Sequence, residues 1–290
     1  MVGIFFIQYP TILLHQMNNK FSIGVFDSGY GGLTILKEIC AQLPEYDYIY
    51  LGDNARAPYG PLSFETVYEY TLQCVKWFFK NGCPLVILAC NTASAKALRT
   101  IQQNDLPKID KSKRVLGVIR PTSEIIDEYT KGNHIGIMAT EGTVKSESYL
   151  IEIEKFHPSI KVTQEACPAW VELVENGKHH SIEANEPVKR HIEQLLKNDD
   201  KIDCILLACT HYPLLIDKIK EFVPNDISIL PQGEIVAKSL KMYLENHNEI
   251  VEKCSKNGKR QFFTTGNVAD FNSHASTFFG ATIMAASIKL

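Results

Sequence analysis

Eight cysteines occur in the 290 residues, but no two of them form a C-x-x-C pair. Zinc ribbons and dithiol redox sites use such closely spaced pairs, so neither kind of site is expected. The chain also does not have the form of a short, cysteine-dense secreted scaffold. We therefore expect reduced thiols and a cytoplasmic protein.

The sequence also lacks a strong excess of charge. Its formal net charge is -3 and its isoelectric point is near 6.3, and its longest basic cluster is "KSKR" at residues 111–114. A nucleic-acid-binding surface would need a larger basic patch. The glycines of "DSGYGG" at residues 27–32 match neither G-x-G-x-x-G nor a P-loop, so nucleotide binding is a weak interpretation. A small-molecule partner is favoured.

No apolar run is long enough to cross a bilayer. The first 20 residues contain a short apolar stretch that Pro10 interrupts, and they have neither a basic n-region nor a small-residue cleavage site. We expect no contact with a membrane. Residues 1–21 are interpreted as an N-terminal extension, either disordered or preceding a true start at Met17.

The remaining sequence alternates short apolar runs with segments of helical period, which is typical of an α/β fold. Runs such as "LVILA" and "CILLA" are apolar throughout, as in parallel strands that are covered on both faces. The pattern predicts strands at residues 22–26, 48–51, 84–89, 115–118, 135–138, 160–163, 202–208, 227–230 and 261–264.

Two motifs occur twice. "VILACNTAS" and "ILLACTHYP" place Cys90 and Cys209 119 residues apart (209 minus 90), and "IGVFDSGYGG" has a weaker counterpart, "IGIMATEGTV", 112 residues later (135 minus 23). The similar offsets indicate a duplicated unit. We expect two similar open parallel-sheet α/β domains related by pseudo-two-fold symmetry, with the active site in the cleft between them. The first domain would contain residues 22–116 and 228–290, and the second residues 117–227.

Polar clusters follow several of the predicted strands. Ligands of open α/β sheets lie outside the carboxyl ends of the strands, so these clusters are expected to meet in one cleft. They begin at Asp27, Asp53, Cys90, Ala139 and Cys209.

Cys90 and Cys209 each stand where a buried strand ends and a predicted helix begins. The free N–H groups of a helix start favour a thiolate, so both thiols are expected to ionise near neutral pH. An acyl-transfer nucleophile would leave the second cysteine unused. Removing a proton from a carbon stereocentre and returning one to its other face requires two acid–base groups, as this pair supplies. Inert buried thiols are expected at Cys40, Cys74, Cys83, Cys167, Cys204 and Cys254.

Other residues could assist such a reaction. Asp27 and His211 could relay protons, although an aspartate in this position is more often a turn former. A carbanion would need oriented donors, for which Ser28, Asn91, Thr92 and Thr210 are candidates, with helix capping as the alternative. His179 and His180 lack a spaced partner and are interpreted as solvated surface, so no metal site is expected.

Together these motifs resemble a known family. "GVFDSGYGGLTIL", "DNARAPYG", "ACNTAS", "ATEGTVKSESY" and "ACTHYPLL", within residues 23–280, are similar to the glutamate racemases of bacterial cell-wall synthesis. The resemblance implies a two-base racemase without a cofactor that interconverts L- and D-glutamate, with the D form supplying peptidoglycan synthesis. It implies that Cys90 deprotonates D-glutamate with help from Asp27, and that Cys209 deprotonates L-glutamate with help from His211.

The resemblance also implies further site residues. Glu175 would lie near His211, although the "CPAW" just upstream departs from the family pattern. Substrate contacts are implied for Asp27, Ser28, Tyr59, Gly60, Asn91, Thr92, Thr143 and Thr210. We also expect a homodimer. Two alternatives remain open: an aspartate racemase or another superfamily member, and a non-catalytic protein that binds an acidic metabolite.

Overall fold

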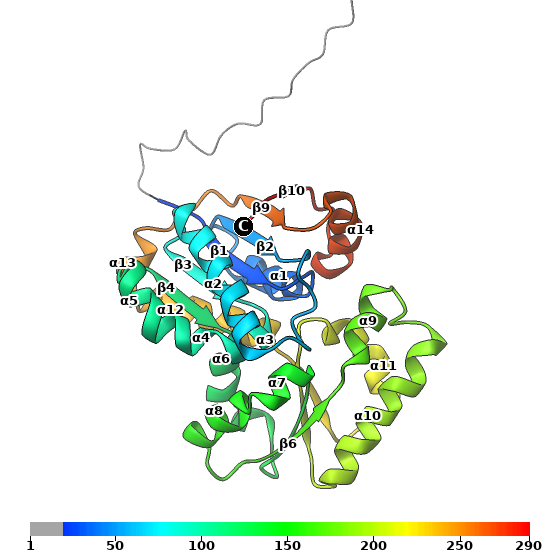
Figure 1. The fold of residues 1–290 in the computed structure, drawn as a ribbon. Helices are drawn as coiled ribbons and strands as arrows, with labels where there is room; N and C mark the ends of the chain where they lie inside the picture. Colours follow the sequence, from blue (N-terminus) through cyan, green and yellow to red (C-terminus); the bar gives the residue numbers. More distant parts are fainter. Residues whose placement is uncertain (1–19) are drawn as a thin grey trace, which may run out of the picture.

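The computed structural model describes residues 20–290, which form two parallel β-sheets flanked by helices (Figure 1). This confirms the α/β prediction, and each of the nine predicted strands is present. The three-residue strand β10 was not predicted. The strands are β1 (Ile23–Asp27), β2 (Tyr48–Gly52), β3 (Leu85–Leu88), β4 (Arg114–Gly117), β5 (His134–Ala139), β6 (Lys161–Ala166), β7 (Cys204–Ala208), β8 (Ser228–Pro231), β9 (Arg260–Thr264) and β10 (Ala285–Ser287).

The two sheets share a strand order. The first sheet runs β10-β9-β2-β1-β3-β4 and the second β6-β5-β7-β8. The segment β2-β1-β3-β4 therefore corresponds to β6-β5-β7-β8, strand for strand. This correspondence places the repeated motifs at equivalent positions, because β1 matches β5 and β3 matches β7.

The strand pairing corrects one domain boundary. The predicted boundary before residue 228 put residues 228–231 in the first domain. β8 pairs with β7, so these residues belong to the second sheet. The sequence could not decide this, because a short apolar strand followed by a helix fits the edge of either sheet. The chain returns to the first sheet only with helix α12 (Gly233–Glu245), which packs against α1 (Gly32–Gln42).

The boundary at the N-terminal end also differs slightly. Phe21 forms a parallel bridge with Cys254, and the Phe21 ring lies beside Gly82. The fold therefore already includes residue 21, which was predicted to be in the extension. Residues 1–19, with the predicted alternative start at Met17, lie outside the described residues.

Amphipathic sequence explains how the longer helices pack. In α10 the buried side chains Val188, Ile192 and Leu195 recur at helical spacing. In α2 the hydroxyl of Ser63 caps the first turn by accepting a hydrogen bond from the Thr66 amide. The other helices are α3 (Asn91–Lys96), α4 (Leu98–Thr100), α5 (Leu106–Ile109), α6 (Ile119–Glu124), α7 (Glu141–Lys145), α8 (Ser148–Phe156), α9 (Ala169–Glu175), α11 (Ile216–Lys220), α13 (Asn248–Val251) and α14 (Val268–Phe279), with α2 spanning Phe64–Lys80 and α10 Asn185–Asn198.

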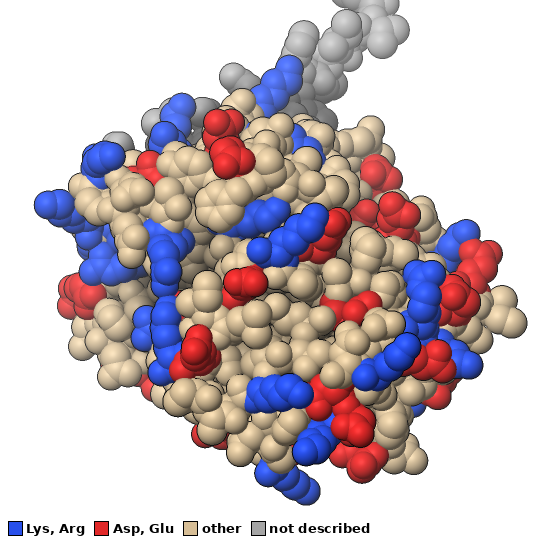
Figure 2. Space-filling view, turned by 60° about the horizontal axis from the view of Figure 1, so that its bottom comes forward, with Lys and Arg blue, Asp and Glu red and all other residues tan. Residues whose placement is uncertain are grey.

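The outer surface matches the nearly balanced charge of the sequence. Basic and acidic side chains are both spread over the face shown in Figure 2, with uncharged surface between them. Within residues 20–290, no helix has the length and apolar character needed to cross a membrane.

Candidate active site

Cys90 lies two residues after the end of β3 and is the N-cap residue of α3. Its Sγ accepts a hydrogen bond from the Ala93 amide at 3.5 Å and lies 3.5 Å from the Ser28 hydroxyl. Burial, followed by the nearby charge of Asp27, raises the pKa of Cys90 to about 12. The prediction of a thiolate favoured by the helix start is therefore wrong for this residue, because desolvation outweighs the two weak hydrogen bonds. Cys90 is a thiol at neutral pH.

Asp27 is the last residue of β1 and is almost completely buried, with 1% of its surface exposed. Its Oδ2 accepts a hydrogen bond from the Gly29 amide at 2.9 Å. The Thr210 hydroxyl donates to Oδ1 at 3.5 Å. Burial raises the pKa of Asp27, while the positive charge of His211 opposes that shift. Asp27 thus links the first sheet to the loop that carries Cys209.

Cys209 follows β7. The sequence predicted that an α-helix begins at this residue, but none does. The 3-10 turn Tyr212–Leu215, which contains Pro213, comes before α11. The Cys209 thiol instead lies 4.0 Å from His211 Nδ1. The two repeated motifs therefore give their cysteines different partners: a helix start for Cys90 and an imidazole for Cys209.

His211 is buried between Cys209 and Glu175. Its Nε2 lies 3.0 Å from Glu175 Oε1, and its ring packs edge-on against Phe278. Burial alone would lower the pKa of His211, but the hydrogen bonds to Cys209 and Glu175 outweigh burial and raise it to about 10. His211 is therefore an imidazolium at neutral pH, held between Cys209 Sγ and Glu175 Oε1.

The glycine-rich loop that follows β1 passes very close to this histidine. A Cβ added to Gly31 would lie 2.2 Å from Thr210 Oγ1 and 2.5 Å from His211 Nδ1. Only glycine leaves room for such a contact. The loop of the first sheet and the Cys209 loop of the second sheet are thus packed directly against each other.

Three threonines make a second contact between the sheets. Thr92 Oγ1, on the helix that Cys90 caps, lies 2.9 Å from Thr140 Oγ1 and 3.5 Å from Thr143 Oγ1. Thr140 caps α7 by accepting a hydrogen bond from the Thr143 amide. Helix capping, the alternative considered for Thr92, is done here by Cys90 and Thr140, whereas the Thr92 hydroxyl contacts the other two threonines.

Asn91 is engaged by residues that the sequence analysis missed. Its Nδ2 donates to Gln232 Oε1 at 2.8 Å, and its Oδ1 accepts from the Tyr149 hydroxyl at 2.6 Å. Gln232 Nε2 in turn donates to Tyr149 at 2.6 Å and to Thr122 Oγ1 at 3.0 Å. Gln232 follows β8, so the rule that polar residues gather after strands could have found it.

We expect Gln232→Ala to lower the free energy of unfolding by about 2–3 kcal/mol, because buried polar groups of Asn91 and Tyr149 lose their partner. Chemical denaturation measures the change. Gln194→Ala is the matched control, since Gln194 makes an exposed hydrogen bond to Asn198 and its loss should leave stability nearly unchanged. Equal effects of the two substitutions would contradict the role assigned to this network.

Tyr59 and Gly60 are neighbours in sequence, but Tyr59 lies in the core and Gly60 lies beside the second sheet's Thr140. The Tyr59 hydroxyl bonds to Asp53, and Arg56 Nε donates to the same carboxylate at 2.7 Å. Tyr59, with 1% of its surface exposed, is thus a core residue. Gly60 faces Thr140, 3.5 Å from the position of an added Cβ.

The predicted surface histidines are not both exposed. His179 is 7% exposed, and its Nδ1 has no hydrogen-bond partner among the described residues. His179 lines a cavity of about 320 Å³ together with Phe278 and Glu175. The polar sequence around His179 did not indicate this position. In residues 20–290, His, Cys, Asp and Glu side chains do not gather in groups of three or more that could hold a metal ion.

Comparisons with known proteins agree with this geometry. Residues 27–238 match the family described as Asp/Glu/Hydantoin racemase. A glutamate racemase from Ruegeria is 38% identical over 267 residues, covering 89% of this chain and 96% of the relative. The crystal structure of a glutamate racemase isoform from Bacillus anthracis aligns with a TM-score of 0.84 and 35% identity, covering 95% of this chain and 99% of the other.

A glutamate racemase from Francisella tularensis, solved in complex with D-glutamate, aligns with a TM-score of 0.83 and 29% identity, covering 93% and 98% of the two chains. The family match includes both repeated cysteine motifs and the loop that begins at Asp27. The chain therefore belongs to the Asp/Glu/Hydantoin racemase family.

Proposed function

We propose that this protein is a glutamate racemase that interconverts L- and D-glutamate by two-base proton transfer between Cys90 and Cys209. The observation that carries the proposal is the different surroundings of two cysteines at equivalent strand ends. Burial raises the pKa of Cys90, whereas Cys209 lies 4.0 Å from the imidazolium of His211. One base and one acid are what a single racemisation step needs.

In the proposed step, the Cys209 thiolate removes the α-proton of L-glutamate and becomes a thiol. The Cys90 thiol then gives its proton to the opposite face of the carbanion and becomes a thiolate, which yields D-glutamate. Reaction of D-glutamate in the reverse direction starts from this second state. We assign to Asp27, whose pKa is raised by burial, the return of a proton to Cys90 between turnovers.

The carbanion requires stabilisation by oriented donors in a water-poor site. We assign substrate contacts to the hydroxyls of Ser28, Thr92, Thr143 and Thr210, and to the backbone of Tyr59 and Gly60. Because Gln232 and Tyr149 already hold the Asn91 amide, Asn91 is fixed in orientation before a ligand arrives. The residues proposed to act on protons are Cys90, Cys209, Asp27, His211 and Glu175.

Incubation in deuterated water tests the function. With L-glutamate, we expect loss of optical rotation together with deuterium incorporation at the α carbon, and little reaction with L-aspartate. A preference for L-aspartate would favour the aspartate racemase alternative. Absence of exchange with both amino acids would support a protein that only binds an acidic metabolite.

The cellular setting is part of the same proposal. A glutamate racemase supplies D-glutamate for peptidoglycan synthesis, a role that would place this protein in the cytoplasm. We further propose that it is a homodimer, which sedimentation equilibrium would test directly. A mass equal to one chain at micromolar concentration would contradict the dimer.

In Glu175→Gln, the fall of kcat/KM at high pH should begin at a lower pH than in the native protein. Glu175 is one of the groups that raise the pKa of His211 from 6.5 to about 10. The protonated imidazole therefore stabilises the folded protein fully below about pH 6.5, and this stabilisation is lost as the pH rises through about 10. Without the Glu175 carboxylate, His211 loses its proton at lower pH. The kcat/KM for L-glutamate, measured from pH 6 to 10.5, reports this shift.

Glu172→Gln is the matched control for that substitution. Glu172 lies on the same helix, α9, and is exposed, so its replacement should leave the fall of kcat/KM at the same pH. An unshifted fall in Glu175→Gln would contradict the coupling of Glu175 to His211.

A further inference from the structure

Lys96 is a buried cation at the end of the helix that Cys90 caps. Only 8% of its surface is exposed. Its Nζ donates to the carbonyl of Leu62 at 2.7 Å and lies 2.9 Å from the position of a Cβ added to Gly142. Among residues 20–290, no carboxylate forms an ion pair with Lys96. An ammonium group has three donors, and the hydrogen bond to Leu62 uses one of them.

A lysine in this position is unfavourable without an anion. Buried lysines are normally paired, because removing a charge from water is costly. Burial, and then the positive charge of Lys145, lower the pKa of Lys96. A neutral carbonyl satisfies hydrogen bonding but does not compensate the charge. The site therefore gains most from an anionic occupant.

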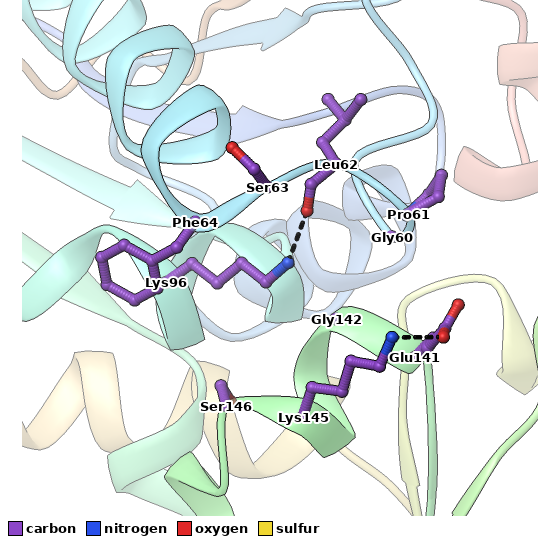
Figure 3. Close-up of a pocket in the computed structure, with 10 residues that line it drawn as sticks. All are labelled: Gly60, Pro61, Leu62, Ser63, Phe64, Lys96, Glu141, Gly142, Lys145 and Ser146. Atoms are coloured by element: carbon purple, nitrogen blue, oxygen red, sulfur yellow. Dashed lines mark hydrogen bonds and ion pairs between the residues drawn. The ribbon is translucent and has the colours of Figure 1, made fainter.

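The Lys96 ammonium faces a cavity of about 350 Å³ between residues 60–64 and helix α7, which we call the outer pocket. Figure 3 shows the Lys96 and Lys145 ammonium groups on two sides of this space, with Glu141 beside Lys145. Lys145 Nζ lies 2.6 Å from Glu141 Oε1. The volume suits a small metabolite and excludes a macromolecule.

The outer pocket adjoins the candidate active site. Gly60, assigned to the substrate contacts, lines the pocket, and its carbonyl oxygen lies 2.5 Å from the position of a Cβ added to Gly142. Gly142 stands between Thr140 and Thr143, which contact Thr92 on the Cys90 helix. The outer pocket therefore borders the helix that Cys90 caps, through Lys96, and the backbone of Gly142.

The charges of the pocket match an acidic amino acid. Two ammonium groups, of Lys96 and Lys145, could receive two carboxylates, and the Glu141 carboxylate could receive the α-ammonium group. Inorganic phosphate would meet the same lysines but would be repelled by Glu141. Charge complementarity therefore favours a zwitterionic dicarboxylate over a simple anion.

We propose that Lys96, Lys145 and Glu141 form a binding site for glutamate outside the catalytic cleft, which the substrate occupies before it moves to the thiols. The identity of this ligand rests on the proposed function. Because the site is occupied before proton transfer, its loss raises KM more than it lowers kcat.

Steady-state racemisation of L-glutamate at low and high ionic strength tests the site. Lys145→Met and Lys96→Met should each raise KM by about 5-fold at low salt and reduce its dependence on salt. Lys145 is largely exposed, so its variant folds even where the loss of Lys96 disturbs packing. Lys189→Met is the matched control, because Lys189 forms a similar i,i+4 pair with Glu193 on α10. An unchanged KM and salt dependence in Lys145→Met would overturn the proposal, as would an equal effect in the control.

Calorimetric binding separates this inference from the proposed function. With the Cys90→Ser/Cys209→Ser protein, L-glutamate should bind at two sites, and Lys145→Met should remove the weaker one. If native protein exchanges no α-proton but this weaker site persists, the racemase proposal fails and the outer pocket stands as a glutamate site. Glu141→Gln should weaken glutamate and strengthen inorganic phosphate in the pocket. Phosphate binding without glutamate binding would overturn the assignment to an amino acid.

Discussion

Replacement of either Cys90 or Cys209 by alanine is expected to abolish glutamate racemisation in both directions, lowering kcat by at least about 10³-fold. In the proposed mechanism, each thiol serves as the base for one enantiomer and as the acid for the other. Loss of either group therefore stops both directions, even though the other thiol remains. Circular dichroism at a wavelength that reports the glutamate enantiomers measures the rates.

Cys204→Ala is the matched control for these substitutions. Cys204 is completely buried in β7, five residues before Cys209, and the mechanism does not use it. Its replacement removes one buried thiol and should cost about 1 kcal/mol of stability while activity is retained. A Cys90→Ala or Cys209→Ala protein that racemises at the native rate would contradict the two-base assignment.

Gly31→Ala is expected to reduce kcat/KM by about 100-fold, since a displacement near 1 Å in a catalytic constellation has an effect of this size. The added Cβ would lie 2.2 Å from Thr210 Oγ1 and 2.5 Å from His211 Nδ1, distances that real Cβ atoms do not show. Thr210 and His211 must therefore move, and His211 can no longer hold both Cys209 and Glu175. Overpacking should also lower stability by about 1–3 kcal/mol, which thermal denaturation would detect.

Gly29→Ala is the control that shows whether this loop tolerates any added side chain, or whether the effect of Gly31→Ala comes from its contact with Thr210 and His211. Its added Cβ would meet Asn54 and Glu175 at 3.7 Å, an ordinary van der Waals distance. We expect its melting temperature to stay close to that of the native protein and its activity to fall much less than that of Gly31→Ala. Similar losses in both variants would argue against the close approach of Gly31 to His211 as the cause.

The two thiols differ more than their repeated motifs suggested. Both cysteines follow an apolar strand and an alanine, so sequence predicted the same helix-start environment for each. In the structure a helix start holds Cys90, whereas a 3-10 turn follows Cys209 and brings His211 to its thiol. This difference puts an imidazolium beside Cys209 and a hydroxyl beside Cys90. We expect Cys209 to act as the first base, on L-glutamate.

Much of the fold was predictable because the strands carry a strong local signal. Buried parallel strands such as Leu85–Leu88 and Cys204–Ala208 are apolar throughout, and turn-forming residues mark their ends. β10, with only three residues of sequence AAS, carries no such signal. The partner of β8 was not predictable either, because pairing depends on contacts distant in sequence.

Sequence alone determined which reactive groups this chain carries: two cysteines in repeated motifs, His211 two residues after Cys209, and Asp27 after the first predicted strand. Only the tertiary structure decided the pKa shifts of these groups and the residues with which they form hydrogen bonds. Desolvation of Cys90, the ion pair of His211 with Glu175 and the network that joins Asn91 to Gln232 depend on residues far apart in the chain. The electrostatic energy of a group depends on what surrounds it in space, which neighbours in the sequence do not specify.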